Sequence, residues 1–175
     1  MKNKFILLIV FFLGITTIQA QNASSESKNT EKQQKGIDFP TTLQNLSAKY
    51  GEQYEKIYSE EDKNYFFRWI FDSGVILVFV PLPEEQQYVG IVAPNEVEDP
   101  VGGLSYGLIL NQSTFQECQE KLAQYKPEWV KENVGGIEYY ILIFLNENTF
   151  NYLYFYKNSM DKNVLKAVTI STTEL

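Results

Sequence analysis

Gly107-Leu108-Ile109-Leu110-Asn111-Gln112-Ser113-Thr114-Phe115-Gln116-Glu117-Cys118 is the stretch that decides the fold, because a degenerate copy of it occurs earlier in the chain. The earlier copy is Gly36-Ile37-Asp38-Phe39-Pro40-Thr41-Thr42-Leu43-Gln44-Asn45-Leu46. Each copy runs from a glycine through a short apolar segment to hydroxyl residues, and then into the apolar-Gln start of a helix. Runs rich in aromatic residues, which are typical of strands, follow both copies. The pattern predicts an architecture and names no reaction.

The two copies define two expected repeat units, 36–94 and 104–171, joined by a connector over 95–103. One such unit buries little surface alone, whereas two units can join their sheets edge to edge and share a core. We therefore expect an α+β fold, with one antiparallel sheet built from two tandem helix–β-meander units and the helices packed on one face. The alternative is a chance similarity between two generic helix–hairpin segments. The aligned positions are Thr42 with Thr114, Leu43 with Phe115, Gln44 with Gln116, and Leu46 with Cys118.

Two helices and seven strands are expected. The first helix covers about 42–50, with Thr41 and Gln44 at capping-box spacing and Gly51 as its stop. The second helix ends before Pro127, and its apolar face is Phe115, Cys118 and Leu122. Its cap is either Ser113 with Gln116 or Thr114 with Glu117. The polar segment 52–64 holds either a helical turn or an irregular strand. Strands are expected over 65–71, 75–80, 88–93, 104–110, 137–145, 150–156 and 164–171.

The N-terminal segment 1–20 is expected to be a signal peptide. Lys2 and Lys4 precede an apolar run from Phe5 to Ile15, and Ala20 offers a small residue for cleavage. The alternative is an uncleaved anchor, but the apolar run is shorter than the ~20 residues that a spanning helix needs. With no cysteine near the cleavage site, a lipoprotein is not expected. The polar segment 21–35 is expected to be a disordered tether, because it has too little apolar surface to offset its ordering entropy. One domain, 36–175, remains.

Charge and composition argue against several classes of function. The formal net charge is −7, and it becomes about −9 without Lys2 and Lys4. An acidic surface disfavours nucleic acid and anionic membranes as partners. The chain has no histidine, which excludes imidazole catalysis and histidine metal ligands. Cys118 is the only cysteine and is expected to be a buried residue on a helix face, with a reactive thiol as the alternative.

The acidic residues do not indicate catalysis. They cluster in polar loops, where carboxyl groups keep ordinary pKa values, and no serine–lysine motif is present. We therefore expect no enzyme, no cofactor and no metal. Three acids in the connector could hold a calcium ion, but they lack the regular oxygen-ligand spacing of a calcium loop, so a solvated linker is favoured. These three are Glu96, Glu98 and Asp99.

The order of a helix and an antiparallel meander, repeated in an exported chain, resembles the β-lactamase-inhibitor-protein fold. It is also similar to the small outer-membrane assembly lipoprotein domain, with Gly107 to Cys118 as the best-matching segment of 36–171. The resemblance implies a curved sheet with helices on one face and a protein-binding surface on the other. The disulfide cysteines of the inhibitor and the lipid-bearing cysteine of the assembly protein are both missing here. Neither partner, and no functional residue of either family, carries over.

The parity of the segment 150–156 points to a binding surface. One face carries Tyr152, Tyr154 and Tyr156 with Phe150, and the other carries Leu153 and Phe155 for packing under a helix. Tyrosines in a row suit an amphipathic, half-wet interface. The alternative is that they close the core with their hydroxyls at its rim. Arg68, between Phe66 and Ile70, is expected to turn its strand face toward solvent.

The function expected is therefore that of an exported, non-enzymatic protein-binding module, periplasmic or secreted and without a stable membrane anchor after cleavage. Its binding residues are expected to be Tyr152, Tyr154, Tyr156 and Arg68. An envelope toxin-neutralising (immunity) protein or an enzyme inhibitor is the first alternative. A small apolar-ligand carrier or a hydrolase is a further one, and a carrier predicts an enclosed apolar cavity of several hundred Å³.

Overall fold

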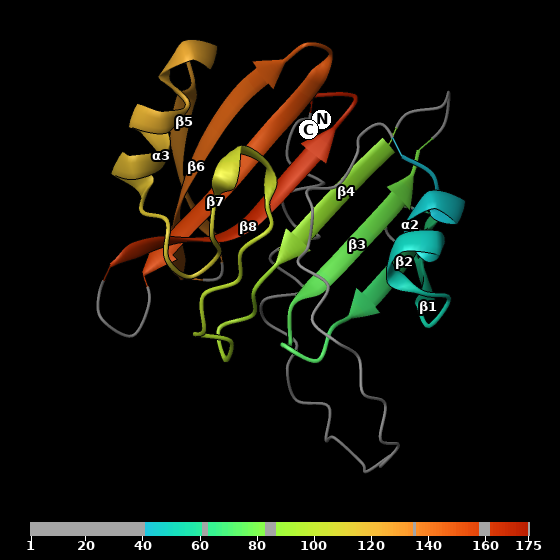
Figure 1. The fold of residues 1–175 in the computed structure, drawn as a ribbon. Coiled ribbons are helices and arrows are strands. Elements are labelled where there is room, and N and C mark those ends of the chain that lie inside the picture. The colour runs from blue at the N-terminus through green and yellow to red at the C-terminus, as the bar shows by residue number, and fades with distance from the viewer. Residues whose placement is uncertain (1–40, 61–62, 83–86, 135, 158–161, 175) are drawn as a thin grey trace.

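The computed structural model describes residues 41–60, 63–82, 87–134, 136–157 and 162–174. The described chain folds as α+β, with one eight-stranded antiparallel sheet in the order β1-β2-β3-β4-β8-β7-β6-β5 (Figure 1). The expected signal peptide and tether, 1–20 and 21–35, lie outside the described residues. The elements, in chain order, are α2 (Leu43–Tyr50), β1 (Glu55–Ser59), β2 (Asn64–Ile70), β3 (Ile76–Pro81), β4 (Gln87–Val92), the 3-10 helix η1 (Ser105–Gly107), α3 (Phe115–Lys121), the 3-10 helix η2 (Ala123–Tyr125), β5 (Glu128–Val134), β6 (Ile137–Asn146), β7 (Thr149–Lys157) and β8 (Asn163–Ser171).

The sheet consists of two four-stranded meanders that meet in its middle. Strands β1 to β4 follow α2, and strands β5 to β8 follow α3. The last strands of the two meanders, β4 and β8, pair with each other in antiparallel register from Tyr88↔Ser171 to Val92↔Ala167. The strands β1 and β5 therefore lie at the two edges of the sheet.

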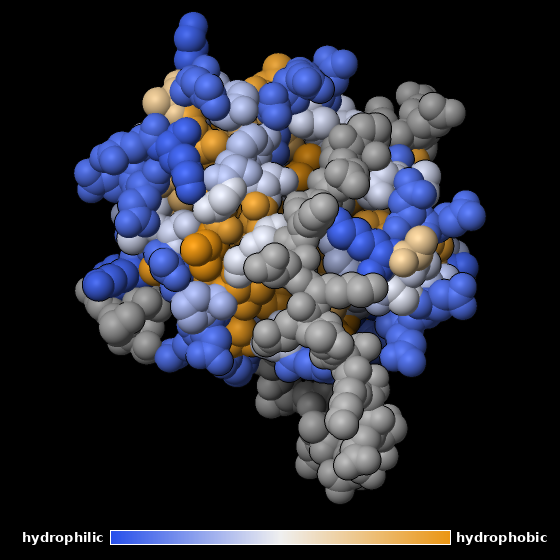
Figure 2. All heavy atoms as spheres, viewed as in Figure 1, coloured by the Kyte–Doolittle hydropathy of each residue, from blue (hydrophilic) through white to orange (hydrophobic). Residues whose placement is uncertain are grey.

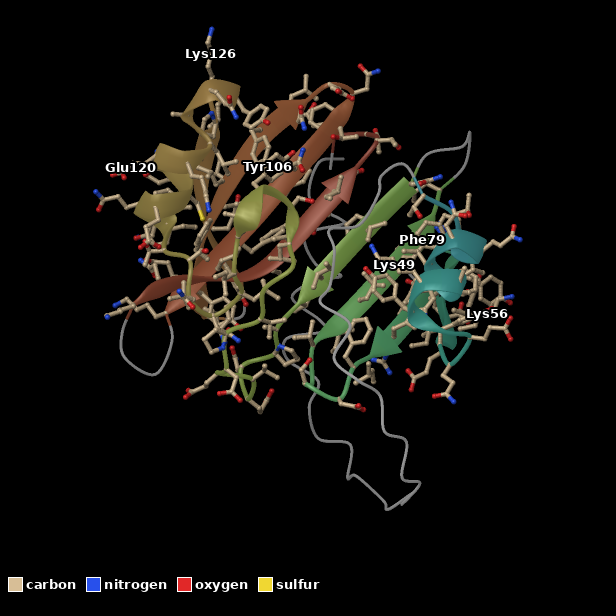
Figure 3. All side chains as sticks on the ribbon, viewed as in Figure 1. Lys49, Lys56, Phe79, Tyr106, Glu120 and Lys126 are labelled. Atoms are coloured by element: carbon tan, nitrogen blue, oxygen red, sulfur yellow. The ribbon has the colours of Figure 1, made fainter. Side chains whose placement is uncertain are left out.

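Strand register divides the side chains between two faces, because successive residues of a strand point to opposite sides. One row of paired residues crosses the sheet from Leu77 through Ile91, Val168 and Leu153 to Leu142. Both described α-helices pack on the face that carries this row, which we call the helix face. Phe79 lies beneath α2, and Tyr106 on η1 lies over the C-terminal strands, whereas Glu120 and Lys126 point outward (Figure 3).

Two apolar clusters hold the helices to this face. Leu46 of α2 packs with Phe67, Trp69, Leu77 and Phe79. The other cluster joins Cys118 and Leu122 of the α3 segment to Leu142, Phe144, Leu153, Phe155 and Leu165. The expected packing of Leu153 and Phe155 under a helix is confirmed. The outer surface on this side is polar over the helices, with apolar residues showing between them (Figure 2).

Each described α-helix begins at a threonine cap. Thr42 accepts a hydrogen bond from the Asn45 backbone N–H at 3.1 Å, so the cap is one residue later than the expected Thr41. The Thr41 N–H donates instead to Gln87 Oε1 at 2.8 Å. Thr114 and Glu117 form a complete capping box, which selects the second of the two caps that the sequence left open.

The expected strand over 104–110 is wrong. Ser105–Gly107 form the 3-10 turn η1, and only Leu110 makes a bridge, to Val101. Tyr106 and Gly107 both have a φ of 61°, which is left-handed backbone and incompatible with a strand. The Ser113 hydroxyl holds the end of this loop by accepting from the Ile109 N–H at 3.0 Å.

Two strands lie where the sequence predicted none with certainty. Strand β1 occupies part of the ambiguous segment 52–64, and β5 follows Pro127 in a polar stretch. Both are edge strands, and such strands tolerate charged residues because one side of their backbone has no partner strand. Their polar sequences hide the apolar alternation that marks an interior strand.

Candidate protein-binding face

The face of the sheet opposite the helices is apolar and rich in tyrosine. A second row of paired residues crosses it from Ile76 through Val92, Ala167 and Tyr154 to Ile141. Six strands contribute to one continuous cluster, and no described helix contributes to it. We call this surface the tyrosine face, and its buried members are Phe66, Ile76, Val78, Val80, Tyr88, Val92, Tyr139, Ile141, Tyr152, Tyr154, Tyr156 and Ala167.

The parity expected for the tyrosines of β7 is confirmed, and their exposure is not as expected. Tyr152, Tyr154 and Tyr156 belong to the tyrosine face, opposite Leu153 and Phe155. Their exposed fractions are 5%, 3% and 5%, so these rings are closed to water, as in the alternative that they close the core, and are not half wet. The rings pack in one cluster with residues from five other strands, β2, β3, β4, β6 and β8. A single strand's sequence does not contain that information.

Three tyrosine hydroxyls on this face have no hydrogen-bond partner among the described residues. They belong to Tyr139, Tyr154 and Tyr156, all of them at most 5% exposed. The hydroxyls of Tyr154 and Thr169 lie near one another but do not have the geometry of a hydrogen bond. A buried hydroxyl without a partner costs about 1–3 kcal/mol, so these three groups call for an explanation.

Burial also fixes the protonation of these side chains. Loss of solvent raises the pKa of Tyr154 well above its ordinary value, and the neighbouring Tyr88 raises it further. Desolvation likewise raises the pKa of Tyr139 and of Tyr156. The hydroxyls therefore remain protonated at neutral pH and can donate a hydrogen bond to an acceptor.

Arg68 lies on the tyrosine face near its β1 end. Its side chain is 21% exposed and forms an ion pair with Glu55, the residue opposite it on β1. The Nε–H donates to Glu55 Oε2 at 2.8 Å. Arg68 thus stands on the same face as the tyrosines, but on the far side of the sheet from β7.

Lys166 lies on β8, in the middle of the sheet, next to Tyr156. It is the extra residue of a β-bulge between Leu165 and Ala167, and it is only 2% exposed. Its ammonium group donates to the Val97 carbonyl at 3.0 Å and lies 5.6 Å from the centre of the Tyr156 ring. Burial lowers the pKa of Lys166, and the charges of Glu98 and Glu96 oppose that shift.

The β5 edge of the tyrosine face is acidic. Glu128, Val130 and Glu132 pair with Ile143, Ile141 and Tyr139 of β6, which places all three on this face. Val130 is 40% exposed, which is high for an apolar residue beside a buried cluster. Among the described residues, neither Glu128 nor Glu132 has an ion-pair partner. The rim thus offers two carboxylates and an apolar contact.

Other candidate sites carry less chemistry. Cys118 is fully buried, and desolvation raises the pKa of its thiol to about 12, as for an unreactive core residue. In the described parts of the chain no three acidic or cysteine side chains converge as metal ligands, Glu96, Glu98 and Asp99 included. A pocket beneath η1, lined by Leu104, Leu108 and Asn151 among others, has a volume of about 20 Å³, which is room for a single water. That pocket is too small for an apolar ligand.

Sequence reasoning missed several residues of the face. Tyr88 and Tyr139 lie on β4 and β6, and they join the β7 tyrosines only through the strand order. Glu128 and Glu132 were missed because β5 itself was not predicted. The sequence signal that could have predicted this strand is the alternation of Glu128, Val130 and Glu132 with Trp129 and Lys131.

Neither a family model, nor a curated protein, nor a solved structure matches this chain. The resemblance to the β-lactamase-inhibitor-protein fold therefore stays an expectation from the sequence. None of the described helices is long and apolar enough to cross a membrane.

Proposed function

We propose that this chain is an exported, non-enzymatic protein-binding module of the bacterial envelope that uses the tyrosine face of its sheet. One observation carries the proposal. Both described α-helices pack on one face of the sheet, while the opposite face is an apolar cluster from six strands to which no described helix contributes. An antiparallel sheet usually turns a face without helices to water and makes it polar, so an apolar face there needs a cover, which in this proposal is a binding partner.

The chemistry of the face suits a protein partner. Tyrosine supplies a large apolar ring with a polar end, and it is enriched at the centres of protein interfaces. Three buried hydroxyls on this face have no hydrogen-bond partner among the described residues, and the rim carries carboxylates and Arg68. The form that we expect after export begins at Gln21, and that form is the one to test.

The same proposal includes a finer account of the fold. In it, 36–94 and 104–171 are two copies of one helix–β-meander unit. The element order supports this, since α2 precedes β1 to β4 as α3 precedes β5 to β8. The central pairing of β4 with β8 supports it too, because each is the last strand of its own meander.

Site-specific photo-crosslinking tests the proposed function. The photoreactive residue p-benzoylphenylalanine would replace Ile143 or Val130 on the tyrosine face, and Lys49 or Glu120 on the helix side as matched controls. We expect crosslinks to another envelope protein from the first pair and none from the second. Equal crosslinking from both faces, or crosslinks from the helix side alone, would contradict the proposal.

A further inference from the structure

We propose that the β5 edge of the sheet binds an extended segment of another protein, which adds to the sheet as a further strand and carries basic residues on either side of an apolar one. This edge uses the backbone and side chains of Glu128–Val134 and none of the buried cluster of the tyrosine face, so the inference goes beyond the proposed function. It draws on the outward side of the β5 backbone, on exposed apolar side chains, and on the charges along the strand.

The β5 backbone has a hydrogen-bonding side that no described strand fills. Its seven residues pair with β6 from Glu128↔Ile143 to Val134↔Ile137, and no described strand lies beyond β5 in the sheet (Figure 1). Alternate residues of an edge strand direct their N–H and C=O groups away from the neighbouring strand. The register with β6 is continuous, and β5 contains no proline, so neither a bulge nor a missing donor blocks this edge. An extended segment can therefore pair with it by β-strand addition.

Apolar side chains are exposed on both sides of this strand. Trp129 is 52% exposed and Val130 is 40% exposed. The Trp129 ring lies on the helix face, where its centre is 6.0 Å from that of Phe115 and 6.1 Å from that of Tyr140. Val130 lies on the other side of the strand, opposite Ile141. A strand added at β5 would place a side chain next to each of these two residues and remove apolar surface from water.

The charges along β5 specify basic residues in the partner. Lys131 pairs with Glu138 at 2.7 Å, whereas Glu128 and Glu132 have no ion-pair partner among the described residues. Glu128, Val130 and Glu132 are alternate residues, so all three lie on one side of the strand. The complementary segment has Lys or Arg opposite each glutamate and an apolar residue opposite Val130. The net charge of −7 favours such a partner as well.

A second copy of this chain does not complement the edge. Two-fold antiparallel pairing of β5 with itself brings residues of the same face opposite one another. Each such register that uses most of β5 puts like charges opposite, either Glu128 with Glu132, or Lys131 with Lys131, or Glu132 with Glu132. Like charges directly opposite destabilise a strand pair. The charge pattern therefore favours a different protein.

The other edge of the sheet, β1, is the matched comparison. It has five residues, and its charged side chains already have partners within the chain. Glu55 pairs with Arg68, and the Lys56 ammonium lies 4.1 Å from the centre of the Tyr65 ring. The same ring lies 4.9 Å from that of Tyr58. We therefore place the site at β5 and not at β1.

Fluorescence anisotropy with designed peptides tests the inference on the exported form, which begins at Gln21. The probe is a labelled nine-residue peptide whose centre reads lysine, threonine, valine, phenylalanine and lysine, with threonine and serine on both sides. A second peptide has glutamates in place of the two lysines, and we expect it to bind at least fivefold more weakly.

Backbone methylation then distinguishes strand addition from contact through side chains alone. Two further peptides carry N-methyl groups on one or the other alternate set of residues. Only one set of N–H groups in an added strand faces β5, so we expect one of these peptides to lose tenfold or more in affinity and the other to bind like the probe. Equal binding of both, or equal loss in both, would overturn the strand.

Variants of the protein locate the charged contacts. Glu128→Gln combined with Glu132→Gln is expected to weaken probe binding about three- to tenfold at low salt, the range for two exposed ion pairs. The matched control, Glu120→Gln combined with Glu147→Gln, changes the net charge equally at exposed positions outside β5 and is expected to leave binding unchanged. Equal loss in both double variants would show a general charge effect and overturn the assigned edge.

Amide hydrogen exchange measured by NMR shows where the probe lies. The amides of Glu128–Val134 that do not donate to β6 should gain protection when the probe binds, and those of Glu55–Ser59 should not. Protection gained on β1, or on neither edge, would overturn the inference, and so would a dimer through β5 that the probe does not dissociate. If crosslinking from Ile143 succeeds while no probe binds, the proposed function stands and this inference alone fails.

Discussion

Removing the hydroxyl of Tyr154 is expected to leave the protein as stable as before or slightly more stable. The Tyr154 side chain is 3% exposed, and its hydroxyl has no hydrogen-bond partner among the described residues. Burying such a group costs about 1–3 kcal/mol, and Tyr154→Phe removes that cost. The loss of one oxygen also leaves a small void, so the expected gain in the free energy of unfolding lies between 0 and about 1 kcal/mol. Urea unfolding followed by far-UV circular dichroism measures it.

Tyr106→Phe is the matched control for this substitution. The Tyr106 hydroxyl accepts a hydrogen bond from Asn146 Nδ2 at 2.8 Å, so its removal is expected to cost about 1 kcal/mol. The reasoning is refuted if Tyr154→Phe lowers the free energy of unfolding by 1 kcal/mol or more. That result would mean that the hydroxyl is satisfied in the folded chain and is not available to a partner.

Three further predictions concern the core and the helices. The Cys118 thiol has a folded pKa of about 12, so below pH ~8.5 it is protonated in both states, and as pH rises only the unfolded chain ionises. This thiol should therefore lower the free energy of unfolding by about 1.4 kcal/mol per pH unit between pH 9 and 10. Urea unfolding at several pH values gives the slope of that free energy against pH, and the slope for Cys118→Ala should lack this contribution. Gly74→Ala should lower the free energy of unfolding more than Gly136→Ala does. Both glycines have a positive φ (79° and 84°), but only at Gly74 would a new Cβ meet another atom, Val97 Cγ2 at 2.7 Å. We expect losses of about 2–3 and about 1 kcal/mol in thermal or urea unfolding, and equal losses would contradict the steric argument. Thr114→Ala should cost about 1 kcal/mol by breaking the capping box, whereas exposed Gln116→Ala should change stability by less than about 0.5 kcal/mol.

The interior of the sheet could be predicted from the sequence, and its edges could not. Strand β3 is apolar throughout, and β7 alternates between two apolar sets, so both stand out as buried strands. Strands β1 and β5 carry charged residues because each has only one neighbouring strand. The prediction of a strand over 104–110 was wrong for a different reason. The apolar residues Leu104, Leu108 and Leu110 are buried from a loop, not from a strand.

For the candidate site, the sequence predicts the side of the strand on which the tyrosines lie, but it does not predict which side chains pack around them. The alternation in 150–156 is enough to put the three tyrosines on one side, because that depends only on the strand's own period of two. Their exposure depends on β6 and β8 as neighbours, and on Tyr88 and Tyr139 from strands far away in the sequence. Lys166 was not predicted either, since its burial depends on a bulge and on the Val97 carbonyl.

The pairing of β4 with β8 has a consequence for how the chain folds. Every other strand pair joins neighbours in sequence, whereas Val89 and Ile170 are separated by about 80 residues, so closing this pair costs the most chain entropy and is expected to come last. Until it forms, each meander has an apolar strand at its open edge. Such edges can pair with those of other molecules, so a delay in this one step would favour aggregation. The Gln87 N–H donates to the Thr172 hydroxyl at 2.9 Å across the end of this seam, and this bond helps to keep the seam closed once it has formed.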